Sequence, residues 1–130
     1  MKNTFVVDAN VILRYLLADH PEHFRQAAQF MGRVKTGEVA AFIPEGVLVE
    51  CVYVLLKFYK VPRAEIAENL ETIMNYKGIV NENRSVLITG LQLFQEKNVD
   101  MVDAIVYAIS KERGWTTFTF DKDLVRLEKK

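Results

Sequence analysis

The chain has few of the residues that mark secreted, disulfide-stabilised proteins. It contains one cysteine, Cys51, which excludes an intrachain disulfide, and the apolar run "VLVECVYVLL" around it predicts a small buried side chain. No uncharged apolar run approaches the roughly 18 residues that a membrane span needs. Asp8 interrupts the first apolar stretch, so we expect no signal peptide and a cytoplasmic protein.

The chain also lacks net charge, since 17 Lys and Arg residues balance 17 Asp and Glu residues. Proteins that coat nucleic acid without discrimination are usually basic, so any nucleic-acid role must depend on a local basic patch or on a partner. No linker rich in Pro, Gly or Ser and no internal repeat interrupts the 130 residues. We therefore expect a single domain spanning residues 1–130.

Short apolar segments alternate with amphipathic ones, which predicts an α/β domain with a short central parallel β-sheet flanked by helices and rich in helix. Strands are expected at residues 5–7, at 39–43 and, from the alternating "WTTFTF", at 115–120. Ser85 is a candidate helix cap, and Gly37 and Gly114 are helix stops. Helices are expected over residues 10–17, 19–37, 44–60, 63–76, 85–97 and 100–114, with a short helix or turn in 121–130.

Four acidic residues occupy positions where apolar sequence predicts a core or its edge. Asp8 follows the first strand, and Asp121 follows "WTTFTF", so both are expected at the carboxyl edge of the sheet, where ligands gather. Glu50 lies in an apolar helix with no Lys or Arg within one turn, so a distant group must compensate its charge. Asp103 lies in another apolar helix, which Asp100 can cap while Asp103 points inward.

If the fold brings these four carboxylates together, their repulsion amounts to several kcal/mol at about 4 Å unless a cation or a proton neutralises them. An all-oxygen set of ligands suits Mg²⁺ or Mn²⁺ rather than Zn²⁺, which prefers His or Cys. The two histidines, His20 and His23, fall at a polar helix start away from these segments. The pattern therefore predicts a site for one or two divalent ions.

These segments resemble a known family. "DANVILRYLL", "VLVECVYVL", "DMVDAIVYA" and "TFTFDKDL" follow the order and approximate spacing of PIN-domain ribonucleases, and more closely of VapC-like toxins of type II toxin–antitoxin systems. Each motif is weak alone, but four in order over nearly the whole chain are specific together. The chain departs from the family at Ala9, where Thr is common, and at Met101, where an aromatic is common. Neither position carries an expected ligand.

The resemblance implies a PIN-like fold and a Mg²⁺- or Mn²⁺-dependent ribonuclease, with Asp8, Glu50, Asp103 and Asp121 as catalytic metal ligands. Metal-assisted phosphodiester hydrolysis uses one ion to activate water and, where present, a second to stabilise the leaving oxygen. The resemblance further implies an RNA substrate, a small antitoxin partner and a homodimer. Groups expected to support the ligands are Asn10, Asp100, Thr119 and Asp123, and those expected to contact the substrate are Arg14 and Lys122.

Simpler structural roles remain open for each acid. Asp8 and Asp103 can be helix caps, Glu50 can pair with a distant cation, and Asp121 can open a turn. Two other functions compete with the nuclease. One is a non-catalytic PIN-like interaction module. The other is a phosphatase of the haloacid dehalogenase type, whose second Asp, two residues after the nucleophile, is replaced here by Asn10.

Overall fold

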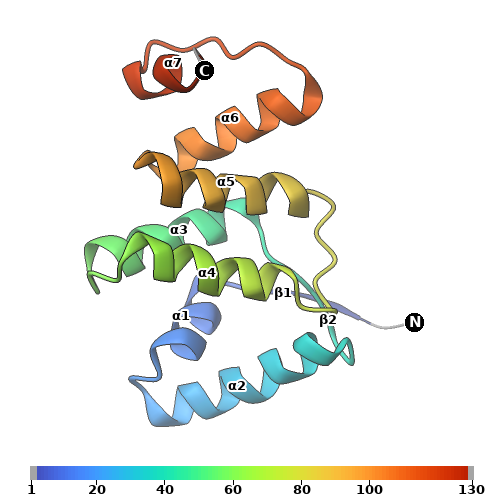
Figure 1. Cartoon of the computed structure of the whole chain (residues 1–130). Coiled ribbons are helices and arrows are strands. Elements are labelled where there is room, and N and C mark those ends of the chain that lie inside the picture. The colour runs from blue at the N-terminus through green and yellow to red at the C-terminus, as the bar shows by residue number, and fades with distance from the viewer. Residues whose placement is uncertain (1–2, 129–130) are drawn as a thin grey trace. The chain divides into compact units, whose positions relative to one another are not determined.

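The structure, a computed structural model, describes residues 3–128 and separates into two compact units (Figure 1). We call residues up to Glu82 the N-terminal unit and residues from Asn83 onward the C-terminal unit. The N-terminal unit holds two strands and four helices, and the described part of the C-terminal unit holds three helices. The prediction of a single domain over residues 1–130 stays a prediction.

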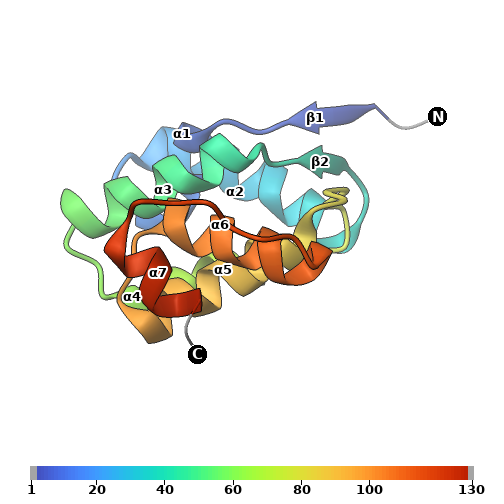
Figure 2. The same cartoon turned by 90° about the horizontal axis from the view of Figure 1, so that it is seen from above.

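A small parallel sheet lies in the N-terminal unit (Figures 1 and 2). Strand β1 (Thr4–Val6) pairs with β2 (Ala40–Phe42), and an isolated parallel bridge joins Ala41 to Ile79. The buried side chain of Asn81 continues this pattern, because it accepts from the Ile43 N–H at 2.9 Å and donates to the Ile43 carbonyl at 2.8 Å. These two hydrogen bonds fix the backbone at the end of the sheet, just before the next helix. We call the pair of bonds the Asn81 clamp.

Four helices complete the N-terminal unit. They are α1 (Ala9–Leu17), α2 (Pro21–Thr36), α3 (Glu45–Lys57) and α4 (Arg63–Met74). Helix α1 contacts α2 and α3, and α3 contacts α4. Their apolar faces form a closed core whose fully buried members include Ile12, Met31, Ile43, Leu48, Ile66 and Leu70. Helix α2 begins at Pro21, two residues later than predicted, and ends as predicted at Gly37, whose φ of 85° is the left-handed conformation that glycine adopts freely.

The C-terminal unit consists of α5 (Arg84–Lys97), α6 (Met101–Arg113) and α7 (Lys122–Glu128). Helices α5 and α6 lie side by side in both views (Figures 1 and 2), and Gly90 of α5 faces Met101 and Ile105 of α6. A Cβ at Gly90 would lie 3.2 Å from Ile105 Cγ1 and 3.3 Å from Met101 Cε, so glycine permits this close approach. Helix α7 packs on α6 through the buried Leu124 and Leu127.

The structure confirms the helix-rich α/β architecture with its parallel sheet, and it corrects two local predictions. Residues 115–120 form no strand, and Phe118 and Phe120 are 87% and 90% exposed. An alternating pattern becomes a strand only where a neighbouring strand supplies hydrogen bonds, and residues 83–128 contain no strand. Ser85 caps no helix, because its hydroxyl instead donates to Glu112 at 2.5 Å. No helix in the described residues is long and apolar enough to cross a membrane.

Candidate metal centre

Asp8 marks the point where β1 gives way to α1. Its extended backbone, with φ −94° and ψ 172°, makes it the N-cap, and its side chain accepts from the Val11 N–H at 3.2 Å. One carboxylate oxygen suffices for this capping bond, and the side chain is exposed. The capping role that the sequence left open is therefore real, and it leaves acceptor capacity on Asp8 for another ligand.

Glu50 lies on α3, and its surroundings differ from the prediction. It is exposed, as is Tyr53 one turn later, whereas Cys51 and Val52 are buried. The apolar composition of α3 suggested burial on every face, but the helix is covered on one side only, and Glu50 lies on the open side. No distant Lys or Arg is therefore needed to compensate its charge, because water solvates the carboxylate.

The charges of Asp8 and Glu50 both affect the pKa of the buried thiol of Cys51. Burial first, and then the charges of Glu50 and Asp8, raise the pKa of the Cys51 thiol to about 12. The thiol also lies 3.9 Å from the carbonyl oxygen of Ala9, the first residue of α1. Since both carboxylates act on the same thiol, the packing of α1 against α3 brings these two predicted ligands to one region of the N-terminal unit.

Asp100 and Asp103 have different structural roles at the start of α6, as the sequence suggested. Asp100 is the N-cap, and its side chain accepts from the Asp103 N–H at 2.9 Å. Asp103 lies in the first turn, is half-buried, and directs its carboxylate at the chain segment that returns from the far end of α6. The cap holds the helix start, so the position of Asp103 is fixed by backbone geometry.

The chain returns along α6 after Gly114, whose φ of 67° ends the helix as predicted (Figure 2). Asp103 to Arg113 rises about 15 Å along the helix, and the residues from Gly114 to Asp121 can span about 23 Å when extended. The return segment is thus long enough to bring Asp121 back beside Asp103. There Asp121 begins α7, accepting from the N–H groups of Asp123 at 2.8 Å and Leu124 at 3.3 Å.

Three aspartates meet at this place. Asp103, Asp121 and Asp123 each offer a carboxylate oxygen, and these oxygens all lie within 4.8 Å of one another. Partial burial first, and then the charges of Asp100, Asp121 and Asp123, raise the pKa of Asp103 to about 6. A cluster that makes one of its own carboxylates hard to ionise is one that a divalent cation would stabilise, and its oxygen donors suit Mg²⁺ or Mn²⁺.

The predicted supporting groups have differing contacts. Thr119 Oγ1 accepts from the Asp121 N–H at 2.9 Å, which fixes the backbone just before α7. Asp123 lies within the cluster and is exposed, and one of its oxygens is 3.6 Å from the Arg126 guanidinium. It was expected only as a supporting group, because an acid two residues after Asp121 resembles an ordinary helix start. Lys122 is exposed at the first position of α7.

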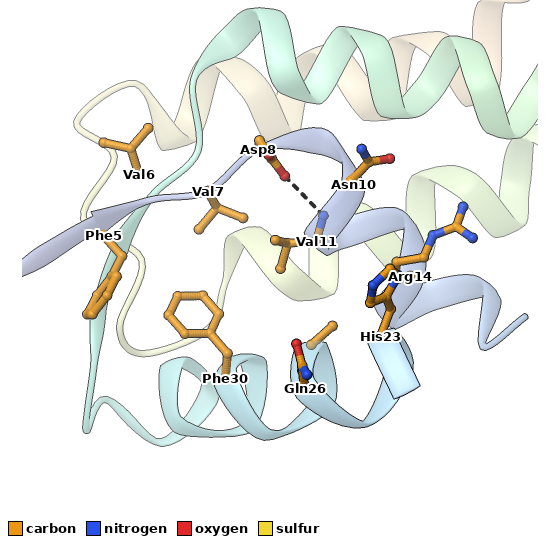
Figure 3. A pocket seen from close by; sticks show the side chains of 11 residues that line it. Phe5, Val6, Val7, Asp8, Asn10, Val11, Arg14, His23, Gln26 and Phe30 are labelled. Atoms are coloured by element: carbon orange, nitrogen blue, oxygen red, sulfur yellow. Dashed lines mark hydrogen bonds between the residues drawn. The ribbon is translucent and has the colours of Figure 1, made fainter. Parts of the chain in front are cut away.

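A pocket of about 410 Å³ opens beside Asp8 between α1 and α2 (Figure 3). Asp8, Asn10 and Arg14 contribute to its lining, and the Arg14 guanidinium is held by Asp19 at 2.7 Å. His23 lines the same pocket, so the expectation that both histidines lie away from the acidic segments is wrong for His23. The reason is that α2 folds back against α1, which places the start of α2 beside the residues that follow β1.

Comparison with known proteins agrees with this layout. A family model described as the PIN domain matches residues 5–130. The chain is 27% identical over 109 residues to a protein named VapC ribonuclease from Aquifex aeolicus (strain VF5), covering 84% of this chain and 80% of that protein. No solved structure matches the chain. The family match extends from β1 through the last described helix, and the chain belongs to the PIN-domain family.

Proposed function

We propose that this chain is a divalent-metal-dependent endoribonuclease that hydrolyses phosphodiester bonds in single-stranded or structured RNA. We further propose that it is the toxin of a VapBC-type toxin–antitoxin pair and acts in the cytoplasm. Membership of the PIN family and the VapC ribonuclease relative support the class of reaction. The observation that carries the proposal is the cluster of Asp103, Asp121 and Asp123, where burial and then the neighbouring acidic charges raise the pKa of Asp103 to about 6.

The proposed ligands are Asp103 and Asp121 of the C-terminal unit and Asp8 and Glu50 of the N-terminal unit, the four acids that the resemblance implies. Two observations support the second pair, since both side chains are exposed and both act on the Cys51 thiol. Asp123 is added as a further ligand or as the partner of an ion-bound water. The donors are all carboxylate oxygens, which fits one or two Mg²⁺ or Mn²⁺ ions.

When bound, such an ion lowers the pKa of water and offsets negative charge at the phosphate under attack. The chain's own residues position this chemistry. The capping bonds of Asp8, Asp100 and Asp121 lock three helix starts, so the nearby carboxylates need little reorganisation before they act. Asn10, one residue into α1, is exposed near Asp8 and is proposed to orient a water or a ligand carboxylate.

The proposed partners follow from the VapC-like assignment. They are an RNA substrate, a small antitoxin that blocks the site, and a second copy of the chain in a homodimer. Arg14 and Lys122 are proposed to contact RNA phosphates. Arg14 already pairs with Asp19, but a guanidinium has five N–H donors and can bind a carboxylate and a phosphate together.

A test of the function combines cleavage with metal binding. The purified chain should cleave a mixed-sequence RNA in Mn²⁺ and lose this activity in EDTA, and Mn²⁺ should raise its melting temperature. Asp8→Asn, which keeps an N-cap, should show a much smaller Mn²⁺-induced shift while its melting temperature in EDTA stays close to that of the wild type. Glu68→Gln, which neutralises an exposed carboxylate on α4, is the control and should behave as the wild type.

The competing interpretation is a non-catalytic PIN-like interaction module. It predicts no cleavage of any RNA in Mn²⁺ and equal melting temperatures with and without the ion. That pair of results would contradict the nuclease proposal. A phosphatase of the haloacid dehalogenase type is disfavoured by the family match, and hydrolysis of phosphomonoesters instead of RNA would be its signature.

A further inference from the structure

The pocket beside Asp8 has the features of a binding site for a small planar group (Figure 3). Its floor is apolar and closed, with Val7 and Ala27 only 2% and 6% exposed. Its far wall consists of Phe5 and Phe30, whose rings meet edge to face with centroids 5.4 Å apart. Concave, mainly apolar sites with a few polar groups at the mouth are typical of small-ligand sites, and a volume of about 410 Å³ is within their usual range.

Polar side chains stand at the mouth of this pocket. Gln26 of α2 lines the pocket, and its amide nitrogen donates to Glu22 at 3.4 Å, which leaves the amide oxygen as an acceptor (Figure 3). His23 and Arg14 also line the pocket, and Arg14, paired with Asp19, supplies further N–H donors. Asp8, a proposed metal ligand, belongs to the same lining. Apolar walls, an amide and a cation thus surround one opening next to the proposed reaction centre.

We propose that this pocket binds one nucleobase of the RNA, adjacent to the bond that is cleaved, and so contributes to the choice of cleavage sequence. The inference rests on the proposed ribonuclease function and adds a recognition site to it. The base lies against the Phe5 and Phe30 rings, and the Gln26 amide bonds its polar edge. The attached phosphate then lies towards Asp8 and Arg14.

The composition favours a base over an apolar side chain from a protein partner. A base has an aromatic face that stacks on rings and an edge of donors and acceptors that needs partners. An aliphatic side chain in the same place would cover the Gln26 amide oxygen without giving it a donor, which costs free energy. Arg14 and Asp8 at the mouth also suit a phosphate approaching with its metal ion, whereas an aliphatic side chain brings no charge for either to bind.

Direct binding is measured by NMR titration of the full chain with each of the four ribonucleoside 5′-monophosphates in EDTA. We expect at least one nucleotide to shift the signals of Val7, Ala27 and Phe30. Phe30→Ala should raise the dissociation constant of that nucleotide about tenfold, because stacking on an aromatic ring contributes that much or more per base. Phe30→Leu, which keeps the apolar volume without the ring, guards against a folding defect and should also weaken binding. Phe58→Ala removes a 72% exposed ring on another surface and should change nothing.

Cleavage provides the second readout. On RNAs that differ only in the base beside the cleaved bond, Phe30→Leu and Gln26→Ala should reduce the wild-type preference several-fold, whereas the control Phe58→Ala should keep it. If the wild type cleaves no RNA but binds nucleotides in this pocket, the proposed function fails and the pocket assignment stands. If cleavage is normal but both variants keep the wild-type preference, the pocket assignment fails alone.

Two further outcomes would overturn the inference. One is the absence of nucleotide-induced shifts at Val7, Ala27 and Phe30 for all four bases. The other is a shift of these signals by an apolar peptide but by no nucleotide, which would assign the pocket to a protein partner.

Discussion

The two units hold their acidic residues in different ways. In the N-terminal unit, Asp8 and Glu50 are exposed on helices packed over a closed core, and their shared effect is felt by the buried thiol of Cys51. In the C-terminal unit, Asp103, Asp121 and Asp123 crowd together, and the pKa of Asp103 rises to about 6. The two carboxylates of the N-terminal unit are thus exposed to water. The three carboxylates of the C-terminal unit lie close together, where a divalent cation would reduce their repulsion.

This contrast has a physical consequence for the proposed site. A carboxylate cluster with a raised pKa binds a cation readily, because the ion removes an existing repulsion. Exposed carboxylates gain less from neutralisation, because water already solvates them. The C-terminal unit should therefore supply most of the affinity for the ion, whereas catalysis should need acids from both units.

The largest expected effect tests whether both units take part in catalysis. Asp103→Asn and Asp8→Asn should each reduce RNA cleavage by about 10³-fold or more, because losing a metal ligand removes several kcal/mol of transition-state stabilisation. The measurement is the single-turnover rate in saturating Mn²⁺, with Glu68→Gln as the control. Loss in one variant and full activity in the other would confine the site to a single unit.

The next prediction concerns the stability of the N-terminal unit, which depends on the buried side chain of Asn81. Asn81→Ala removes both bonds to Ile43 and leaves a buried N–H and carbonyl unsatisfied, so the free energy of unfolding should fall by about 2–3 kcal/mol. Urea denaturation followed by circular dichroism measures this. Asn69→Ala, at a half-buried position on α4, is the comparison, and an equal effect of the two variants would contradict the clamp.

Substituting one helical glycine in each unit tests how closely the neighbouring side chains pack there. Gly90→Ala places a Cβ against Ile105 and Met101 and should lower the free energy of unfolding by about 1–3 kcal/mol. Gly32 lies inside α2 with nothing within 4 Å of an added Cβ, so Gly32→Ala should raise it by about 0.5–1 kcal/mol. Urea midpoints report both changes. Stabilisation by Gly90→Ala would show that α5 and α6 are less closely packed than described.

The last prediction concerns pH in the absence of metal. The folded-state pKa of Asp103 is raised from 3.8 to about 6, so the folded chain binds more protons than the unfolded chain between these values. Stability should therefore fall as pH rises from about 4 to about 6.5, by about 1 kcal/mol after allowance for solvent screening. Melting temperatures in EDTA measure this change. In Asp103→Asn this contribution should disappear, and an identical pH profile would contradict the crowding.

Much of the fold was predictable because local signals determined it. Pro21, Gly37, Asp100 and Gly114 mark helix ends through backbone geometry that depends only on neighbouring residues. Residues 115–120 were predicted wrongly because alternation indicates a strand only if another segment pairs with it, and that is a tertiary property. The exposure of Glu50 was missed for a related reason, since apolar composition cannot show which face of α3 is covered.

The candidate site was predictable in part. Asp8 and Asp121 were identified because each follows an apolar segment, and Asp103 because it lies within an apolar helix; the structure places Asp103 beside Asp121. The contribution of Asp123 depends on how α7 returns to α6, which no local pattern encodes. The pocket beside Asp8 depends on α2 folding against α1, so neither Phe30 nor His23 could be assigned to it from their own segment.

The most direct measurement of the central claim is paramagnetic broadening of backbone amide signals by substoichiometric Mn²⁺. We expect strong broadening around Asp103 and Asp121 together with Asp8 and Glu50, and little effect around Glu68 on α4. Broadening confined to the amides near Asp103, Asp121 and Asp123, with those of Asp8 and Glu50 unaffected, would contradict the proposed set of four carboxylate ligands.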